Sequence, residues 1–261
     1  MKNLGRLFVI VSGAVVLGGC SLFQFQPEPG FRLVTNGVDL AGWHKNPEKI
    51  SHGTGGRWTV EDGAFTGEQD PPGSGNGGIL LSDELFGDFE VIFETQPDWG
   101  VCSGFFLRGN DRGQCYQIMV DYHDNGNIGE IFREGLDGQS NRTFRIDGIY
   151  DDQKSLQGIE ATRMPEDQKG AGGDGEPRFP LADWAKIWKL GDWNTIRATV
   201  VGNPPTITTY INGTLITEYT SDKKFEDELG DRGSIAVQVH AGTSWPDGAK
   251  VRFRRIRVRE L

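Results

Sequence analysis

Apolar and polar residues alternate one by one through much of the chain after residue 30. This period of two is typical of β-strands that bury one face, because successive side chains point to opposite sides of a strand. Clear examples are the apolar positions 89, 91 and 93, then 196, 198 and 200, and finally 235, 237 and 239. Asn212-Gly213 lies between two further runs, 206–211 and 214–219, and predicts a two-residue hairpin turn. The pattern therefore predicts short antiparallel strands.

Two stretches interrupt this alternation, at residues 69–78 and 147–180, and we expect both to be loops. Trp184 and Trp188 have helical spacing within residues 181–190, which predicts a short helix packed on the domain. No long periodic helix accompanies the strands. We therefore predict an all-β fold, a β-sandwich of two antiparallel sheets with long loops and one short helix.

The N-terminus has the order of a signal peptide. Lys2 and Arg6 precede an apolar run at residues 7–17, and Gly18 and Gly19 lead to Cys20. Eleven helical residues would cross only about half of a hydrocarbon core roughly 30 Å thick, so the run is too short to span a bilayer. Residues 17–20 also resemble the lipobox of bacterial lipoproteins, which ends in an acylated cysteine. The alternative is plain secretory cleavage beside a cysteine.

These features divide the chain into a signal peptide at 1–19, a lipidated Cys20 with a tether at 20–30, and one domain at 31–261. We expect the protein in the cell envelope, lipid-anchored on the periplasmic or outer-surface side of a membrane. The formal net charge is −10. An acidic surface repels phosphate backbones and anionic headgroups, so nucleic acid is excluded as a partner and membrane contact is expected only through the anchor.

Cys102 and Cys115 remain after lipidation, in a compartment that permits disulfides. They lie on either side of a predicted hairpin, and the sequence leaves open whether they pair, because bond geometry decides it.

In three predicted strands, the residues on the side facing away from the core are mostly polar. Alternation at 115–123 and 232–240 predicts that apolar side chains face the core, namely Tyr116, Ile118, Val120, Ile235, Val237 and Val239. The opposite parity, together with residue 108 of a third strand, gives a candidate polar surface of Arg108, Gln117, Asp121, His123, Gln238 and His240. The alternative is a solvated sheet face without a site.

The chain contains a series of short motifs in a fixed order. The motifs are Asn36-Gly37-Val38-Asp39-Leu40 with Gly42-Trp43, Trp58-Thr59-Val60-Glu61-Asp62-Gly63, Phe89-Glu90-Val91, Ser103-Gly104-Phe105-Phe106-Leu107-Arg108, Tyr116-Gln117-Ile118, Gly191-Asp192-Trp193-Asn194, Ile211-Asn212-Gly213, the run from Gly233 to His240, and the run from Val251 to Ile256. The chain from Phe31 to Leu261 resembles the 3-keto-disaccharide hydrolase domain family. The resemblance implies a concanavalin A-like jelly roll and cleavage of 3-keto-glycosides.

The chain departs from the family pattern in two places. Cys102 stands where the family usually has Asn, and Tyr116-Gln117-Ile118-Met119 stands where the family usually reads Tyr-Glu-Val-Gln, so that an amide replaces a carboxylate at position 117. If that carboxylate is a base or a metal ligand in relatives, this protein uses another group or has lost the activity.

The implied chemistry assigns roles to the polar surface. His240 or Asp121 would remove the C2 proton of a 3-keto sugar, and Arg108 or a divalent cation would stabilise the enolate oxygen. Asp121, His123 and Glu130 are candidate ligands of such a cation. Gln117, His123 and Gln238 would bind the sugar hydroxyls, with Trp99 or Trp245 stacking on a ring.

Two other functions stay open. One is a carbohydrate-binding lipoprotein without catalysis, and the second is a structural surface protein of an assembly.

Overall fold

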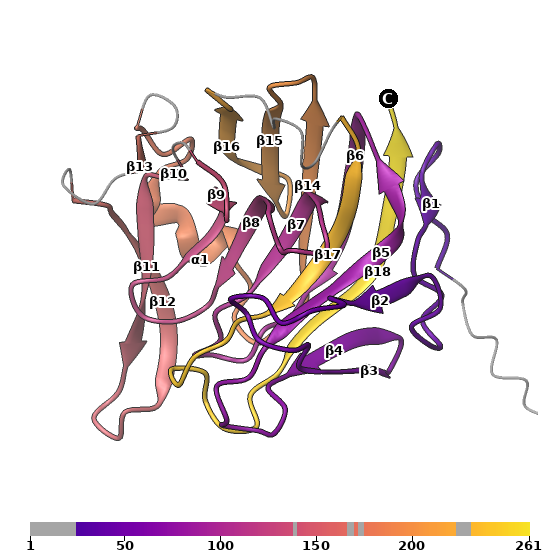
Figure 1. Ribbon diagram of the computed structural model, residues 1–261. Coiled ribbons are helices and arrows are strands. Elements are labelled where there is room, and N and C mark those ends of the chain that lie inside the picture. The colour runs from indigo at the N-terminus through magenta and orange to yellow at the C-terminus, as the bar shows by residue number, and fades with distance from the viewer. Residues whose placement is uncertain (1–24, 138–139, 166–169, 172–174, 223–230) are drawn as a thin grey trace, which may run out of the picture.

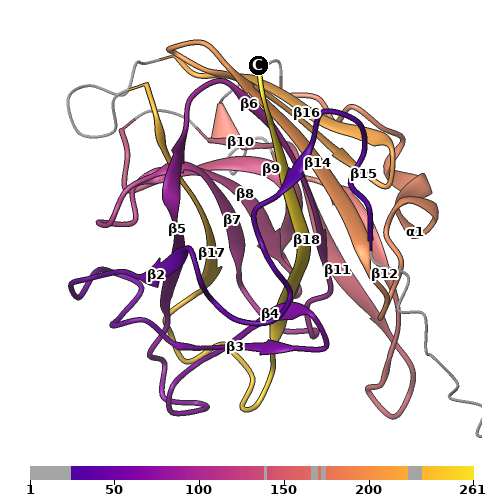
Figure 2. The same cartoon turned by 90° about the vertical axis from the view of Figure 1, so that its right-hand side faces the viewer.

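Two antiparallel sheets pack face to face, with their strands seen side by side in Figure 1 and the two layers seen edge-on in Figure 2. The computed structural model describes residues 25–261 except 138–139, 166–169, 172–174 and 223–230. The predicted signal peptide and Cys20 lie outside the described residues. No helix in the described part of the chain is long and apolar enough to cross a membrane.

The larger sheet has eight strands in the order β16-β15-β14-β6-β18-β4-β3, with β1 also paired to β18. Its strands are β1 (Arg32–Leu33), β3 (Arg57–Glu61), β4 (Ala64–Glu68), β6 (Phe89–Thr95), β14 (Asn194–Val201), β15 (Thr206–Ile211), β16 (Thr214–Thr220) and β18 (Val251–Glu260).

The smaller sheet has six strands in the order β2-β5-β17-β7-β8-β9. Its strands are β2 (Trp43–Lys45), β5 (Gly78–Phe86), β7 (Gly104–Gly109), β8 (Cys115–Asp121), β9 (Asn127–Glu134) and β17 (Gly233–Val239). This arrangement confirms the predicted all-β jelly-roll sandwich.

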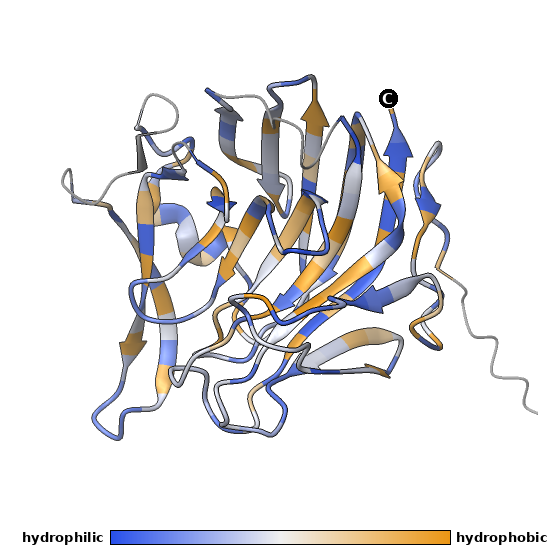
Figure 3. Cartoon of the chain, viewed as in Figure 1, coloured by the Kyte–Doolittle hydropathy of each residue, from blue (hydrophilic) through white to orange (hydrophobic). Residues whose placement is uncertain are grey.

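Alternate side chains of both sheets fill the space between them, and Figure 3 shows apolar and polar positions interleaved along the strands. All six residues predicted to face the core are fully buried: Tyr116, Ile118, Val120, Ile235, Val237 and Val239. Phe93 and Phe105 stack across the two sheets with ring centroids 4.0 Å apart. Burial of these side chains supplies most of the driving force for folding.

Turn chemistry fixes the predicted hairpin between β15 and β16. Asn212 and Gly213 both have positive φ, at 48° and 88°, as a type I′ turn requires. The pairing Ile211↔Thr214 confirms the predicted hairpin.

The expected loop at residues 147–180 is largely a hairpin instead. β11 (Phe144–Tyr150) pairs with β12 (Leu156–Arg163), and the short strands β10 (Asn141–Arg142) and β13 (Gly170–Ala171) form a second pair. The segments that form β11 and β12 are rich in glycine and charged residues. They therefore lack the alternating apolar residues from which a strand is predicted. Residues 69–78 do form a loop between β4 and β5.

The predicted short helix is confirmed as a 3₁₀ turn, η1 (Leu181–Asp183), followed by α1 (Trp184–Ile187). The Trp184 and Trp188 rings are buried and stacked 6.2 Å apart.

Residues 25–30, the described part of the predicted tether, lie along β18. Glu28 forms an ion pair with Arg257 at 2.5 Å, and the Phe25 ring lies under the guanidinium groups of Arg255 and Arg257. This part of the segment is therefore bound to the larger sheet.

A glycine-rich loop at residues 46–56 folds over the outer face of the six-stranded sheet. Ile50 packs on a small apolar cluster of that face, formed by Ile79, Leu81, Phe106, Cys115 and Ala236. A Cβ on Gly53 would lie 2.4 Å from Asn76 Oδ1, so the loop needs glycine at this close approach. The loop brings His52 onto the sheet.

Candidate functional site

Seven polar side chains gather on the outer face of the six-stranded sheet, where β7 begins and β8 and β17 end. We call them the polar cluster: His52, Cys102, Gln117, Asp121, His123, Gln238 and His240. Three of the four histidines of the chain are among them. The period-two pattern of β8 and β17 places Gln117, Asp121, Gln238 and His240 opposite the core, as the sequence predicted.

Gln117 and Gln238 meet across the central strand β7. Gln117 Nε2 donates to Gln238 Oε1 at 3.0 Å, although the two residues lie on β8 and β17 with β7 between them. The residue between them is Gly104, and a Cβ there would lie 2.1 Å from Gln117 Nε2. Glycine at this position therefore makes the contact between the two amides possible.

His52 extends this chain of hydrogen bonds to the sheet edge. Gln238 Nε2 lies 3.2 Å from His52 Nδ1 and 3.3 Å from His52 Nε2. His52 Nε2 lies 3.3 Å from Glu134 Oε1. His52 and Gln238 are both buried, so each polar atom in this chain needs its partner.

A neighbouring carbonyl fixes one ring nitrogen of His240. Its Nδ1 lies 2.5 Å from the carbonyl oxygen of Ala241, which can only accept, so Nδ1 carries the hydrogen. Nε2 is then the nitrogen with a lone pair, the form needed for proton abstraction or metal binding. The His240 ring also packs edge-on against His52, with ring centroids 5.3 Å apart.

Cys102 and Asp121 face each other at the start of β7. The thiol donates to Asp121 Oδ1 at 3.1 Å. Burial raises the pKa of the Asp121 carboxyl, while the Cys102 thiol and the imidazoles of His123 and His240 oppose this. Burial also raises the pKa of the Cys102 thiol well above its ordinary value. The backbone N–H of His240 donates to Cys102 O at 3.3 Å, which places the two residues side by side.

Residues of the β11–β12 hairpin hold the turn that carries His123. His123 Nδ1 donates to the Asp124 carbonyl oxygen at 2.8 Å, so Nε2 has the lone pair, as in His240. The Asp124 carboxylate accepts from Gly148 N and from Tyr150 Oη, each at 2.8 Å. Asp147 Oδ1 accepts from Asn125 N at 2.9 Å. The β11–β12 hairpin thus holds this turn in place.

Arg108 lies at the opposite end of β7 and does not join the cluster. It has a positive φ of 50°, and β7 contains one more residue than β17 between the pairs Phe106↔Ala236 and Gly109↔Ser234. This bulge reverses the expected direction of the side chain. The buried guanidinium donates to Gly87 O at 2.8 Å, Gly202 O at 2.7 Å and Asp88 Oδ1 at 2.6 Å.

Glu130 is also separate from the cluster. Its carboxyl accepts from Thr143 N at 2.8 Å, Thr143 Oγ1 at 2.6 Å and Asn127 Nδ2 at 2.7 Å. It is fully buried, and burial raises its pKa to about 7. The predicted trio of cation ligands is therefore divided: Asp121 and His123 lie together, with Cys102 in the third position instead of Glu130.

The aromatic residues predicted to stack on sugar differ in exposure. Trp245 is 4% exposed and donates through its indole N–H to Ala249 O, which makes it a structural residue. Trp99 is half-buried against Tyr122 and donates to Tyr150 Oη at 2.9 Å. Phe132 is 42% exposed and pairs directly with Gln117 in register, so it shares the face of the cluster.

Sequence analysis did not identify His52, Cys102 as a ligand, or Phe132. A single histidine among glycines at residues 51–56 was the one local signal for His52. The sequence indicates Cys102 as a possible disulfide partner of Cys115 and as a departure from the family pattern, but not as a ligand. Phe132 lies after a register shift in β8–β9, which obscures the parity of its strand.

The cysteines are not bonded to each other. Cys102 lies at the beginning of β7, whereas Cys115 lies at the far end of the β7–β8 hairpin in an apolar cluster. Along the hairpin, the two cysteines are separated by six residues of strand. At the usual rise per residue this is roughly 20 Å, which is too far for a disulfide.

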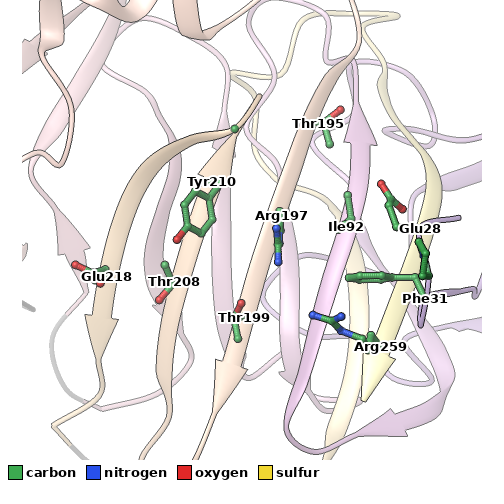
Figure 4. A pocket seen from close by; sticks show the side chains of 12 residues that line it. Glu28, Phe31, Ile92, Thr195, Arg197, Thr199, Thr208, Tyr210, Glu218 and Arg259 are labelled. Atoms are coloured by element: carbon green, nitrogen blue, oxygen red, sulfur yellow. The ribbon is translucent and has the colours of Figure 1, made fainter. Parts of the chain in front are cut away.

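A separate hollow of about 700 Å³ lies on the outer face of the eight-stranded sheet (Figure 4). Threonines of β14 and β15 line it with Tyr210, Arg197 and Arg259. Both arginines form ion pairs with the buried Glu90, which offsets one of their two positive charges. The described lining contains the carboxylates Glu28 and Glu218 but no histidine or cysteine, whereas three histidines and a cysteine gather on the other sheet.

Solved structures with a similar fold were found for this chain. A candidate glycosyl hydrolase from Parabacteroides distasonis is 16% identical with a TM-score of 0.50, covering 89% of this chain and 94% of that chain. A second candidate glycosyl hydrolase from the same organism is 17% identical with a TM-score of 0.49, covering 88% and 99%. The carbohydrate-binding module CBM66 from Bacillus subtilis is 11% identical with a TM-score of 0.41, covering 83% and 94%.

The family follows from a sequence model. The model described as a 3-keto-alpha-glucoside-1,2-lyase-like domain matches residues 30–259. The chain therefore belongs to this family, which confirms the resemblance found in the sequence motifs. Comparison with curated proteins gave no significant match.

Proposed function

We propose that this protein cleaves 3-keto-glycosides at the polar cluster. The observation that carries the proposal is the tautomer of His240, which the Ala241 carbonyl fixes with the hydrogen on Nδ1, at a position whose backbone is bonded to Cys102. Membership of a 3-keto-glucoside lyase-like family and the likeness to glycosyl hydrolases support a sugar as the substrate.

The reaction has three steps. A ketone at C3 acidifies the C2 hydrogen, and His240 Nε2 accepts that proton while negative charge develops on the C3 oxygen. The enolate then expels the C1 oxygen substituent, which leaves with a proton and creates a C1=C2 double bond. Water adds at C1 and a proton returns to C2, so the net reaction is hydrolysis. This route needs no pair of carboxylates flanking the bond.

The geometry changes one assignment of the sequence analysis. Arg108 cannot serve as the enolate stabiliser, because its guanidinium donates to two carbonyl oxygens and Asp88 at the far end of β7. Gln117 and Gln238 stay candidates for binding sugar hydroxyls, since their amides lie on the cluster face.

Turnover of matched substrates tests the proposal. Purified protein should release the aglycone from 3-keto-glucosides and leave the parent glucosides intact. His240→Ala should lower turnover by about 10² to 10³-fold. His44→Ala is the matched control, because His44 lies on β2 of the same sheet and contacts Asp83 and Asp111 instead of the cluster. Equal cleavage of keto and parent sugars would indicate a conventional glycosidase instead.

A carbohydrate-binding role without catalysis is the second candidate. The exposed Phe132 beside Gln117 favours it, because aromatic rings and amides are the usual groups that hold a sugar. Saturable sugar binding that Phe132→Ala weakens, with no turnover by the wild type, would establish this function.

We also propose that the protein is lipid-anchored in the cell envelope through Cys20, from the signal-peptide pattern. Cys20→Ser should move the protein from the membrane to the soluble fraction. Retention of this variant in the membrane would contradict the anchor.

A further inference from the structure

We propose that Cys102, Asp121 and His123 form a zinc site. Their ligand atoms, a thiol sulfur, a carboxylate oxygen and an imidazole nitrogen, all lie within 4.8 Å of one another. They come from the start of β7, the end of β8 and the turn that follows it. The site itself rests on geometry, and its role in the reaction rests on the proposed function.

The distances suit a small tetrahedral ion. Zinc bonds of about 2.0–2.3 Å at tetrahedral angles separate neighbouring ligand atoms by about 3.5 Å. Cys102 Sγ and Asp121 Oδ1 are 3.1 Å apart, and the third atom is within 4.8 Å of both. Side-chain movements of about an ångström therefore bring all three to bonding distance.

The donor set selects the metal. Magnesium and calcium prefer oxygen ligands, whereas a thiolate with an imidazole favours zinc among the common ions. Three protein ligands leave a fourth tetrahedral position open, which is the arrangement of catalytic rather than structural zinc.

The ring nitrogen of His123 that would not bind the metal already has a hydrogen-bond partner. Histidines that bind metal usually donate their other ring N–H to a carbonyl or carboxylate, which fixes the ring and the tautomer. His123 Nδ1 does this with the Asp124 carbonyl, and the Asp124 side chain is held by Gly148 and Tyr150. Nε2 is therefore the ligand nitrogen.

The position of the metal gives it a function that Arg108 cannot perform. His240 is the backbone neighbour of Cys102, so the proposed base and the ion lie on adjacent strands. An ion with an open position can hold the C3 oxygen on which negative charge develops.

Metal content tests the site independently of activity. Protein stripped with a chelator and dialysed against Zn²⁺ should retain one ion per chain, and Co²⁺ in its place should give a thiolate-to-cobalt charge-transfer band. Cys102→Asn preserves a hydrogen-bond donor to Asp121 and should abolish the band. It should weaken zinc binding by more than about 100-fold, beyond the usual effect of an outer-shell change. His123→Gln should do the same.

Two variants serve as controls. His44→Gln removes a histidine that contacts two aspartates on the same sheet, and Cys115→Ala removes the buried thiol outside the site; both should bind zinc as the wild type does. Circular dichroism of each variant separates loss of the site from loss of the fold.

The outcomes separate the site from the proposed function. Absence of stoichiometric zinc in the folded wild type, or a cobalt band that survives in Cys102→Asn, would overturn the site. Stoichiometric zinc without cleavage of keto sugars supports the site and contradicts the proposed function. Cleavage by protein that binds no zinc contradicts the site alone.

Discussion

The two ends of β7 both carry polar side chains, but these groups differ in what remains available for chemistry. At the Arg108 end, each guanidinium nitrogen donates to a carbonyl oxygen or to Asp88. At the Cys102 end, His123 and His240 each use one ring nitrogen on a backbone carbonyl and keep a lone pair on the other. A buried polar residue thus indicates function only when its hydrogen-bonding capacity is not already used by the fold.

The largest expected effect is at the Arg108 end. Arg108→Ala would empty a fully buried site and remove the donor to two carbonyl oxygens, and we expect it to lower the free energy of unfolding by about 3–5 kcal/mol. Turnover per folded molecule should stay near the wild-type value. Urea denaturation with activity assays at low temperature measures both. A lower turnover number in fully folded Arg108→Ala would show instead that Arg108 takes part in the reaction.

Glu130 should act on stability in a pH-dependent way. Its pKa in the folded protein is about 7, above the ordinary 4.5. The unfolded chain therefore loses this proton first, and wild-type stability should fall as the pH rises from about 4.5 to about 7. The full effect is about 3 kcal/mol. Glu130→Gln mimics the protonated carboxyl and should remove this fall. Parallel stability curves for the two proteins between pH 4 and 8 would contradict the assignment.

Gly104→Ala should damage the Cys102 end of β7. Its Cβ would lie 2.1 Å from Gln117 Nε2, so the Gln117–Gln238 pair must separate. We expect the affinity for keto sugar to fall by about 10-fold, since one hydrogen bond contributes about 1 kcal/mol and its loss leaves buried groups unpaired. Gly109→Ala, at the other end of β7 where the nearest atom to an added Cβ would lie 3.5 Å away, is the control for a glycine change as such. Unchanged affinity would exclude the amide pair from the site.

Tyr150→Phe should give the smallest effect. It removes the hydrogen bond to Asp124 and leaves the ring in place, so the His123 turn loses one of its supports. Zinc affinity should fall by about 10-fold, within the range for outer-shell partners. Gln157→Ala, at an exposed hydrogen bond to Asp151 of the same hairpin, should leave it unchanged. A wild-type affinity in Tyr150→Phe would show that the hairpin does not support the site.

Strand parity was the most reliable information in the sequence. It predicted the buried faces of β8 and β17 and the shared face of Gln117, Asp121, Gln238 and His240, because two-residue periodicity follows directly from strand geometry. It failed at Arg108, where a bulge with positive φ turns the side chain around. Such a bulge depends on pairing with β17, which no local pattern near Arg108 reveals.

The other failures also depend on contacts distant in sequence. Glu130 matched a ligand by residue type, but it is used by Thr143 and Asn127. His52 reaches the site only because residues 46–56 fold across the sheet. The β11–β12 hairpin lacks an alternating apolar pattern, since much of it is exposed and only Phe144, Ile146 and Ile159 are buried within it.

The origin of the C2 hydrogen in the product tests the proposed chemistry most directly. In D₂O, elimination followed by hydration places solvent deuterium at C2 of the released 3-ketoglucose, whereas direct hydrolysis at C1 retains the original hydrogen. Authentic 3-ketoglucose in the same buffer corrects for spontaneous exchange. We predict deuterium at C2 during wild-type turnover, at a rate that His240→Ala reduces together with cleavage. Product released at the wild-type rate with its C2 hydrogen retained would contradict the account.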